Sequence, residues 1–206
     1  MDQQLIISIG REYGSGGHEI AEALAKRFNL EFYDKNILEK IAEEQQVCST
    51  HLKRYDEAPK FPWLSRTVRG YSNSVEENIA ELQFEYLRRK AREKESFVVV
   101  GRCAEEVLKD CPALISIFVI GRLETKCERI MRIQNVSAES AKMIISRNDR
   151  KRKMYHNYYC QNKWGDSRGY DLSISTSTAG VERTKDILEQ YIRAIIDCRQ
   201  RSMLNV

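Results

Sequence analysis

A glycine-rich loop near the start of the chain constrains the fold more than any other feature. Four glycines fall within the eight residues 10–17, directly after the apolar run 5–9, and an amphipathic helical pattern follows. Glycines cost chain entropy unless a close approach uses them. Backbone N–H groups at a helix N-terminus form a cradle for phosphate oxygens. We therefore expect a phosphate-binding site at Gly10, Gly14, Ser15, Gly16, Gly17, His18 and Glu19.

The loop departs from the common phosphate-loop pattern G-x-x-x-x-G-K-[ST]. When the pattern is aligned on Gly16, the place of its lysine is taken by Gly17. The next residues, His18 and Glu19, supply no Ser or Thr hydroxyl for a magnesium ion. A purely structural turn between strand and helix is the plain alternative for this loop.

Strand and helix patterns alternate along the rest of the chain. Short apolar runs predict strands at 5–9, 30–33, 97–100, 114–120 and 171–175, and helical periodicity follows them, including 74–94 and 181–199. Ser74 is placed to cap the helix 74–94, and residues 57–73 predict a loop. Strands that alternate with helices favour a parallel sheet with helices on both faces.

Composition limits the classes of protein that this chain can belong to. The 206 residues, 42% of them apolar, are enough for one ordered domain. The most apolar stretch, 113–120, is too short to cross a bilayer, and no secretory signal is visible, so we expect a cytoplasmic protein. A net charge of +4 is too mild to predict nucleic-acid binding by itself.

The six cysteines form no CxxC pair and predict reduced thiols rather than a disulfide scaffold. His156 and Cys160 stand four residues apart and could share a helix face. Two groups make at best half a metal site, so reduced, partly buried thiols are the better interpretation.

Two groups of basic residues suit phosphate chemistry. Arg102 follows the predicted strand 97–100 at its carboxyl end, where ligands bind in open α/β sheets. The densest basic run, 147–153, could close over a transferring phosphoryl group as an arginine-rich lid. A surface salt bridge for Arg102 and a solvated helix face for the run, with Asp149 and Glu139 for local pairing, are the alternatives.

Seven segments together resemble the cytidylate kinase-like family. They occur in the family's order and span nearly the whole chain except roughly 47–95: IISIGREYGSGGHEIAEALAKRF, FYDKNIL, VVVGRCAEEVLKDCP, FVIGRLETKCERIMR, NDRKRKMYHNYY, KWGD and YDLSISTS.

The resemblance implies a nucleoside monophosphate kinase-like α/β fold of the P-loop class, a three-layer sandwich in one domain, 1–206. It also implies a helical substrate-binding insertion at about 35–95 and a basic lid at about 137–165. The expected reaction transfers the γ-phosphoryl group of ATP, with Mg²⁺, to a nucleoside monophosphate, CMP or dCMP by family analogy. Neither nucleic acid nor a membrane is an expected partner.

The family's substrate contacts map onto particular residues of this chain. Asp34, Lys35, Lys40 and Arg102 match positions at the monophosphate site. Val100 and Cys103 stand where two acids flank the matching arginine in true cytidylate kinases.

The catalytic cations are expected at Arg11 and in the lid. Losing one well-placed donor costs about 3–4 kcal/mol, so we expect another cation to replace the absent lysine. Arg147 and Arg150 match lid arginines of the family. The expected catalytic residues are Arg11, Arg147, Arg150 and Arg152, and the Mg²⁺ candidates are Ser15, Glu19 and Asp34.

The sequence leaves three alternatives open. The missing lysine and the changed acids favour a nucleotide-binding sensor or regulator that no longer transfers phosphate. A phosphorylated acceptor that is not a nucleotide is a second alternative, because the residues expected to read the base are the ones that changed. A nucleic-acid-binding protein built on the basic run is the weakest alternative, and it predicts steeply salt-dependent binding. The oligomeric state is not predicted.

Overall fold

A central parallel sheet organises the computed structural model, which describes residues 3–45, 67–68, 71–72 and 75–204. Its strand order is β2-β5-β1-β6-β7, and every neighbouring pair is parallel. The predicted parallel sheet is therefore confirmed. The strands are β1 (Ile6–Arg11), β2 (Glu31–Tyr33), β5 (Phe97–Val100), β6 (Leu114–Ile120) and β7 (Leu172–Ser175).

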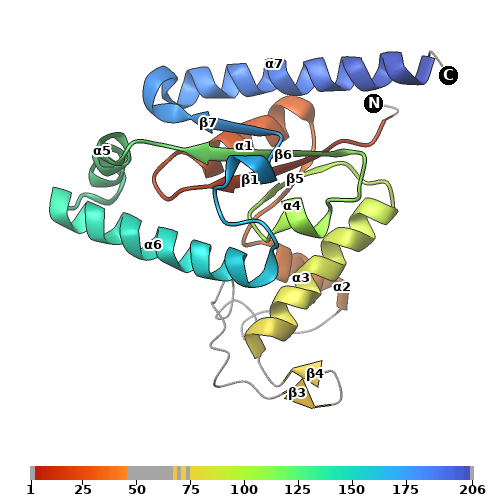
Figure 1. The fold of residues 1–206 in the computed structure, drawn as a ribbon, viewed down its shortest axis with the longest axis horizontal. Helices are drawn as coiled ribbons and strands as arrows, with labels where there is room; N and C mark the ends of the chain where they lie inside the picture. The colour runs from red at the N-terminus through yellow and green to blue at the C-terminus, as the bar shows by residue number, and fades with distance from the viewer. Residues whose placement is uncertain (1–2, 46–66, 69–70, 73–74, 205–206) are drawn as a thin grey trace.

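Helices cover both faces of this sheet (Figure 1). Successive side chains of β1 point to opposite faces, as a strand requires. Ile7 and Ile9 pack with α1 and α7, whereas Ile6 packs with α2, α3 and α4. The helices are α1 (Gly17–Phe28), α2 (Ile37–Gln45), α3 (Val75–Arg92), α4 (Ala104–Val107), α5 (Leu123–Gln134), α6 (Ala138–Tyr159) and α7 (Thr176–Leu204).

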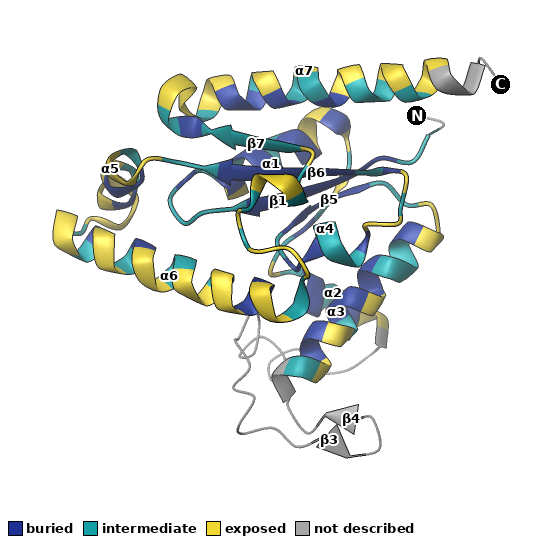
Figure 2. Ribbon diagram, viewed as in Figure 1, coloured by how far each residue is buried: buried dark blue, intermediate teal, exposed yellow. Residues whose placement is uncertain are grey.

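The helix α6 lies beside the sheet with α5 and exposes one side along its whole length (Figure 2). Ser137 caps its N-terminus by accepting a hydrogen bond from the Ser140 N–H at 3.2 Å. The buried Ala141 and Ile145 pack against α5. The basic run 147–153 is thus part of one continuous helix rather than a loop.

The predicted loop 57–73 and the end of the predicted last helix differ most from the structure, and several other predicted ends shift by one or two residues. The expected loop 57–73 contains a short antiparallel pair of strands, β3 (Thr67–Val68) and β4 (Tyr71–Ser72). Each strand has only two residues, which is too short for an apolar pattern to reveal it in the sequence. The remainder of that stretch and the predicted cap Ser74 lie outside the described residues. The element α7 consists of two helices joined at Gly180, whose φ of 76° is not helical; the second begins at 181, as predicted, and extends to Leu204 rather than 199.

The strand order places the expected ligand site at the carboxyl ends of the central strands. After β1 the chain builds β2 and β5 on one side, and then crosses to build β6 and β7 on the other. Ligands of open α/β sheets bind at such a switch point, beyond the carboxyl ends of the strands. Among the described residues, none of the helices is both long and apolar enough to span a membrane.

Candidate active site

A cavity of about 680 Å³ opens at the switch point, beyond the ends of β1 and β5. This volume falls within the range of small-molecule sites. Six cationic side chains and three carboxylates line it, so the cavity carries excess positive charge. The cations are Arg11, Lys35, Arg102, Arg129, Lys151 and Arg152, and the carboxylates are Glu12, Glu19 and Asp34.

The glycine loop presents the N-terminus of α1 to this cavity. Gly16, the N-cap, has a left-handed conformation (φ 83°) that glycine adopts readily. Oγ of Ser15 accepts the Gly17 N–H at 3.4 Å, and within the described residues no other side chain caps the first turn of α1, which leaves the N–H groups of His18 and Glu19 available to an anion. The hydroxyl of Ser15 is buried inside the loop, where it donates to the Glu12 carbonyl at 2.8 Å.

Arg11 occupies the space beside Gly17, the position where the common pattern has lysine. A Cβ added at Gly17 would lie only 2.6 Å from Cβ of Arg11. A side chain at position 17 is therefore incompatible with the present path of Arg11. The arginine and the glycine form a matched pair, and the cation next to the loop comes from the end of β1 instead of the start of α1.

Arg102 lies in a strained turn at the end of β5. Gly101, Arg102 and Cys103 all have positive φ angles, of 73°, 61° and 51°. A left-handed conformation costs a non-glycine residue roughly 1–3 kcal/mol, and such residues cluster at functional sites. Arg102 is only 2% exposed and donates from Nη2 to the Asp34 carbonyl at 3.1 Å. The turn therefore fixes a buried guanidinium at the cavity wall.

The helix α6 contributes one face of its basic run to the cavity. Asn148, Lys151 and Arg152, at helical spacing, line the cavity, whereas Arg147 and Arg150 are exposed. Arg152 donates to the Arg11 carbonyl at 3.1 Å, and its guanidinium lies 5.3 Å from the centre of the Tyr13 ring. Only part of the predicted lid therefore contacts the loop.

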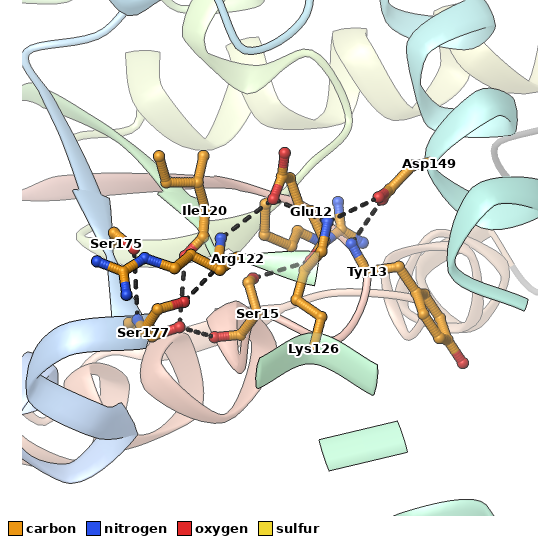
Figure 3. A network of polar contacts seen from close by, with 12 residues as sticks. Glu12, Tyr13, Ser15, Ile120, Arg122, Lys126, Asp149, Ser175 and Ser177 are labelled. Carbon is orange, nitrogen blue, oxygen red and sulfur yellow. Dashed lines mark hydrogen bonds and ion pairs between the residues drawn. The ribbon is translucent and has the colours of Figure 1, made fainter. Parts of the chain in front are cut away.

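An ion network holds the loop from its other side (Figure 3). Nζ of Lys126, from α5, lies 2.9 Å from Oε2 of Glu12 and 3.3 Å from Oδ2 of Asp149. The Tyr13 N–H donates to Oδ1 of Asp149 at 2.6 Å. Burial raises the pKa of Asp149, against the opposing effect of the Tyr13 N–H and Lys126. The network ties the loop to α5 and α6 through a largely buried lysine.

Two carboxylates in the cavity are held ionised by neighbours. Hydrogen bonds and the charges of Lys185 and Arg129 lower the pKa of Glu19 to about 2. Burial would raise the pKa of Asp34, but hydrogen bonds from His18 and from the Asn36 N–H outweigh it and lower that pKa.

The cavity brings together most of the predicted site residues. It is lined by Arg11, Gly14, Gly16, Gly17, His18, Glu19, Asp34, Lys35, Arg102 and Arg152. Gly10 and Ser15 line neighbouring cavities, and Lys40 pairs with Glu31 at 2.6 Å and lies over the Tyr33 ring.

Sequence reasoning missed several residues of the site. Arg129 lies in α5, the helix that follows β6, and it lines the cavity. Its position soon after the carboxyl end of a predicted strand, where ligands bind in such sheets, could have indicated this role. Nothing in the local pattern marks Lys126, and Asp149 was interpreted as a local partner of the basic run. The structure corrects that interpretation, because Asp149 pairs with Lys126 and the Tyr13 N–H.

Fold and site together define a kinase-like α/β protein of the P-loop class. The model of the cytidylate kinase-like family matches residues 6–178, and the chain belongs to this family. The predicted three-layer fold and the family resemblance are thus confirmed.

Solved structures share this fold. An uncharacterized protein from Eubacterium ventriosum ATCC 27560 is 39% identical, with a TM-score of 0.73, and the match covers 92% of this chain and 99% of that one. Shikimate kinase from Bacteroides thetaiotaomicron is 15% identical, with a TM-score of 0.53 and coverage of 92% and 98%. Shikimate kinase from Acinetobacter baumannii, in complex with shikimate, is 15% identical, with a TM-score of 0.50 and coverage of 94% of both chains. Among curated proteins, none matches.

Proposed function

We propose that this protein transfers the γ-phosphoryl group of ATP to a nucleoside monophosphate, CMP or dCMP. One observation carries the proposal: the N-terminus of α1, the buried Arg102 and the α6 residue Arg152 meet in a single cationic cavity. Phosphoryl transfer depends on positioning and on electrostatic stabilisation, which such a cavity supplies.

The loop residues fit a triphosphate. N–H groups at the start of α1 offer hydrogen bonds to phosphate oxygens, and the excess of cations offsets the charge. Arg11 is the cation that we propose in place of the loop lysine, because it fills the space beside Gly17. We propose Arg152, which contacts the loop, as a second catalytic cation. Arg147 and Arg150 would act only if α6 moved toward the cavity.

Of the three predicted Mg²⁺ candidates, Asp34 fits best. Its carboxylate lines the cavity, and its partners are an imidazole and a backbone N–H rather than the two cations that hold Glu19. Glu19 is engaged by Lys185 and Arg129, and the Ser15 hydroxyl is turned into the loop. When bound, Mg²⁺ neutralises charge on the phosphates during transfer.

The acceptor monophosphate is proposed to bind next to Asp34, Lys35 and Arg102. All three line the cavity. Val100 lines the cavity and Cys103 is buried, at the two positions where true cytidylate kinases have acids. Neither side chain can therefore offer a carboxylate to the base of the acceptor. We further propose that α2 and α3 belong to the substrate-binding insertion at about 35–95, that α6 forms the lid at about 137–165, and that the protein acts in the cytoplasm.

The test is ADP production from ATP and Mg²⁺ against CMP, dCMP, UMP, AMP and GMP. We expect turnover with one pyrimidine monophosphate, a loss of turnover in Arg102→Ala, and wild-type turnover in Arg193→Ala, an exposed change on α7. Thermal unfolding of all three proteins separates a lost phosphate contact from a lost fold.

A nucleotide-binding regulator is the second candidate function, and Asp149 favours it. Its carboxylate accepts the Tyr13 N–H, so this loop donor is not available to a phosphate. If a protein that still binds ATP produced no ADP with any of the five acceptors, the proposed kinase activity toward these acceptors would be contradicted. Repeating the assay with phosphorylated sugars would then separate a regulator from a kinase with another acceptor.

A further inference from the structure

A second cluster of reactive side chains lies outside the ATP cavity, where α4 meets the end of α6. Nε2 of His156 lies 2.7 Å from Oε1 of Glu105. Ligand atoms of Glu105, His156 and Cys160 all lie within 4.8 Å of one another. The side chains of His156 and Glu105 are 8% and 9% exposed. Glu105 is the partner that the sequence did not reveal for the His156 and Cys160 pair.

The imidazole of His156 approaches the carboxylate through one ring nitrogen. Nε2 faces Glu105, so Nε2 is the nitrogen that a cation shared with Glu105 would bind. Imidazole nitrogen, thiolate sulfur and carboxylate oxygen are the donors that zinc prefers.

The surroundings of the cluster suit a cation. His156 and Cys160 lie at the carboxyl end of α6, which carries partial negative charge. The hydroxyl of Tyr170 lies 3.5 Å from both Glu105 and His156 and offers a further oxygen.

Access to the cluster comes from a cavity of about 300 Å³. Glu105, His156 and Cys160 all line this cavity, which leaves room for a water molecule as fourth ligand. A zinc site with three protein ligands and one open position is a common arrangement. We propose that Glu105, His156 and Cys160 bind one Zn²⁺ ion, which joins the end of α6 to the helix that follows the Arg102 turn.

Cobalt provides the probe, because a thiolate ligand gives Co²⁺ a charge-transfer absorption band. The full chain, purified without chelators in a non-thiol reductant, is titrated with Co²⁺ and then with Zn²⁺. We expect one equivalent of Co²⁺ to bind with a thiolate band, and Zn²⁺ to displace it, as their relative affinities require.

Three variants assign the ligands. Cys160→Ser should abolish the thiolate band, and Glu105→Gln should weaken Co²⁺ binding at least about 10–100-fold, the loss that an outer partner alone causes. Cys111→Ser, which changes another thiol at the same cavity, should leave the band intact. The Tm with and without Zn²⁺ verifies that each variant folds, and only proteins with all three ligands should gain stability from Zn²⁺.

Two results would overturn the proposal. One is the absence of saturable Co²⁺ binding to the wild-type chain, and the other is a thiolate band that persists in Cys160→Ser. Both results are binding measurements and not activity measurements, so they are distinguishable from a failure of the proposed kinase reaction, although Glu105 and His156 share a small cavity with Arg11, Arg102 and Arg152.

Discussion

The two sides of the glycine loop carry cations for different purposes. The side facing the cavity has Arg11, Arg102 and Arg152, which lie where phosphates would bind. The other side has Lys126, which is 8% exposed and pairs with Glu12 and Asp149. A lysine is therefore close to the loop, but it stabilises the loop's shape rather than facing the cavity.

For the proposed phosphate site, this comparison explains how the loop can lack the lysine of the common pattern. The charge for the ligand and the charge for the loop come from separate residues on separate elements: Arg11 from β1 and Lys126 from α5. Substitutions on the two sides should accordingly change different measurements, catalysis on one side and stability on the other.

The largest effect is expected on the cavity side, from Arg11→Ala. This change should lower kcat/KM about 10²–10³-fold with the accepted monophosphate, because a positioned donor to the transferring group is lost. Its Tm should fall little, and Arg11→Lys should retain more activity. Unchanged turnover in Arg11→Ala would remove Arg11 from the catalytic role.

Because Arg11 and Gly17 are matched in size, the cationic side chain can be moved from position 11 to position 17 as a test. Gly17→Lys alone should inactivate and destabilise the protein, because its Cβ would lie 2.6 Å from that of Arg11. Adding Arg11→Gly should recover activity above that of Arg11→Gly alone. If the double variant were no more active than Arg11→Gly alone, a lysine at position 17 would not replace the function of Arg11.

On the opposite side, Lys126→Met should cost about 1–3 kcal/mol of unfolding free energy, because two partly buried carboxylates lose their cation. Urea unfolding measures this loss. A matched control is Lys26→Met, an exposed lysine that pairs with Glu22 on α1 and should change stability by less than about 0.5 kcal/mol. A large loss of activity without a loss of stability in Lys126→Met would break the comparison.

Asp149→Asn tests the contact between the two sides. The amide can still accept the Tyr13 N–H, but it lacks the charge that opposes a phosphate at the loop. ATP should bind about 5–10-fold more tightly, which corresponds to about 1–1.4 kcal/mol. Calorimetric titration with ATP measures the change, and weaker binding would mean that the carboxylate supports the nucleotide-binding conformation.

The smallest effect is expected from the pH dependence of Glu19. Its pKa is lowered from 4.5 to about 2 in the folded chain, so its ionised form stabilises the fold above about pH 4.5. That contribution is lost as pH falls from 4.5 toward 2. Because the side chain is 41% exposed, the effect should stay below about 1 kcal/mol. Wild-type and Glu19→Gln stabilities should therefore converge over this range, and a constant difference would contradict the assignment.

The sequence by itself determined the order of the elements and the family. Strands 97–100 and 114–120 were predicted at their observed bounds, and the loop before α1 fell where it was expected. These features are local, because apolar periodicity and glycine spacing act on neighbouring residues. For the same reason most of the predicted residues that line the cavity come from one short segment, 11–19.

Only the tertiary structure decided which distant residues meet. Lys126 reaches Glu12 across 114 positions, and Glu105 reaches His156 across 51. It also decided which face of α6 lines the cavity, and so separated Arg152 from Arg147 and Arg150. No local pattern encodes these contacts, because they depend on how α4, α5 and α6 pack around the sheet, and that packing is fixed by burial of side chains from the whole chain.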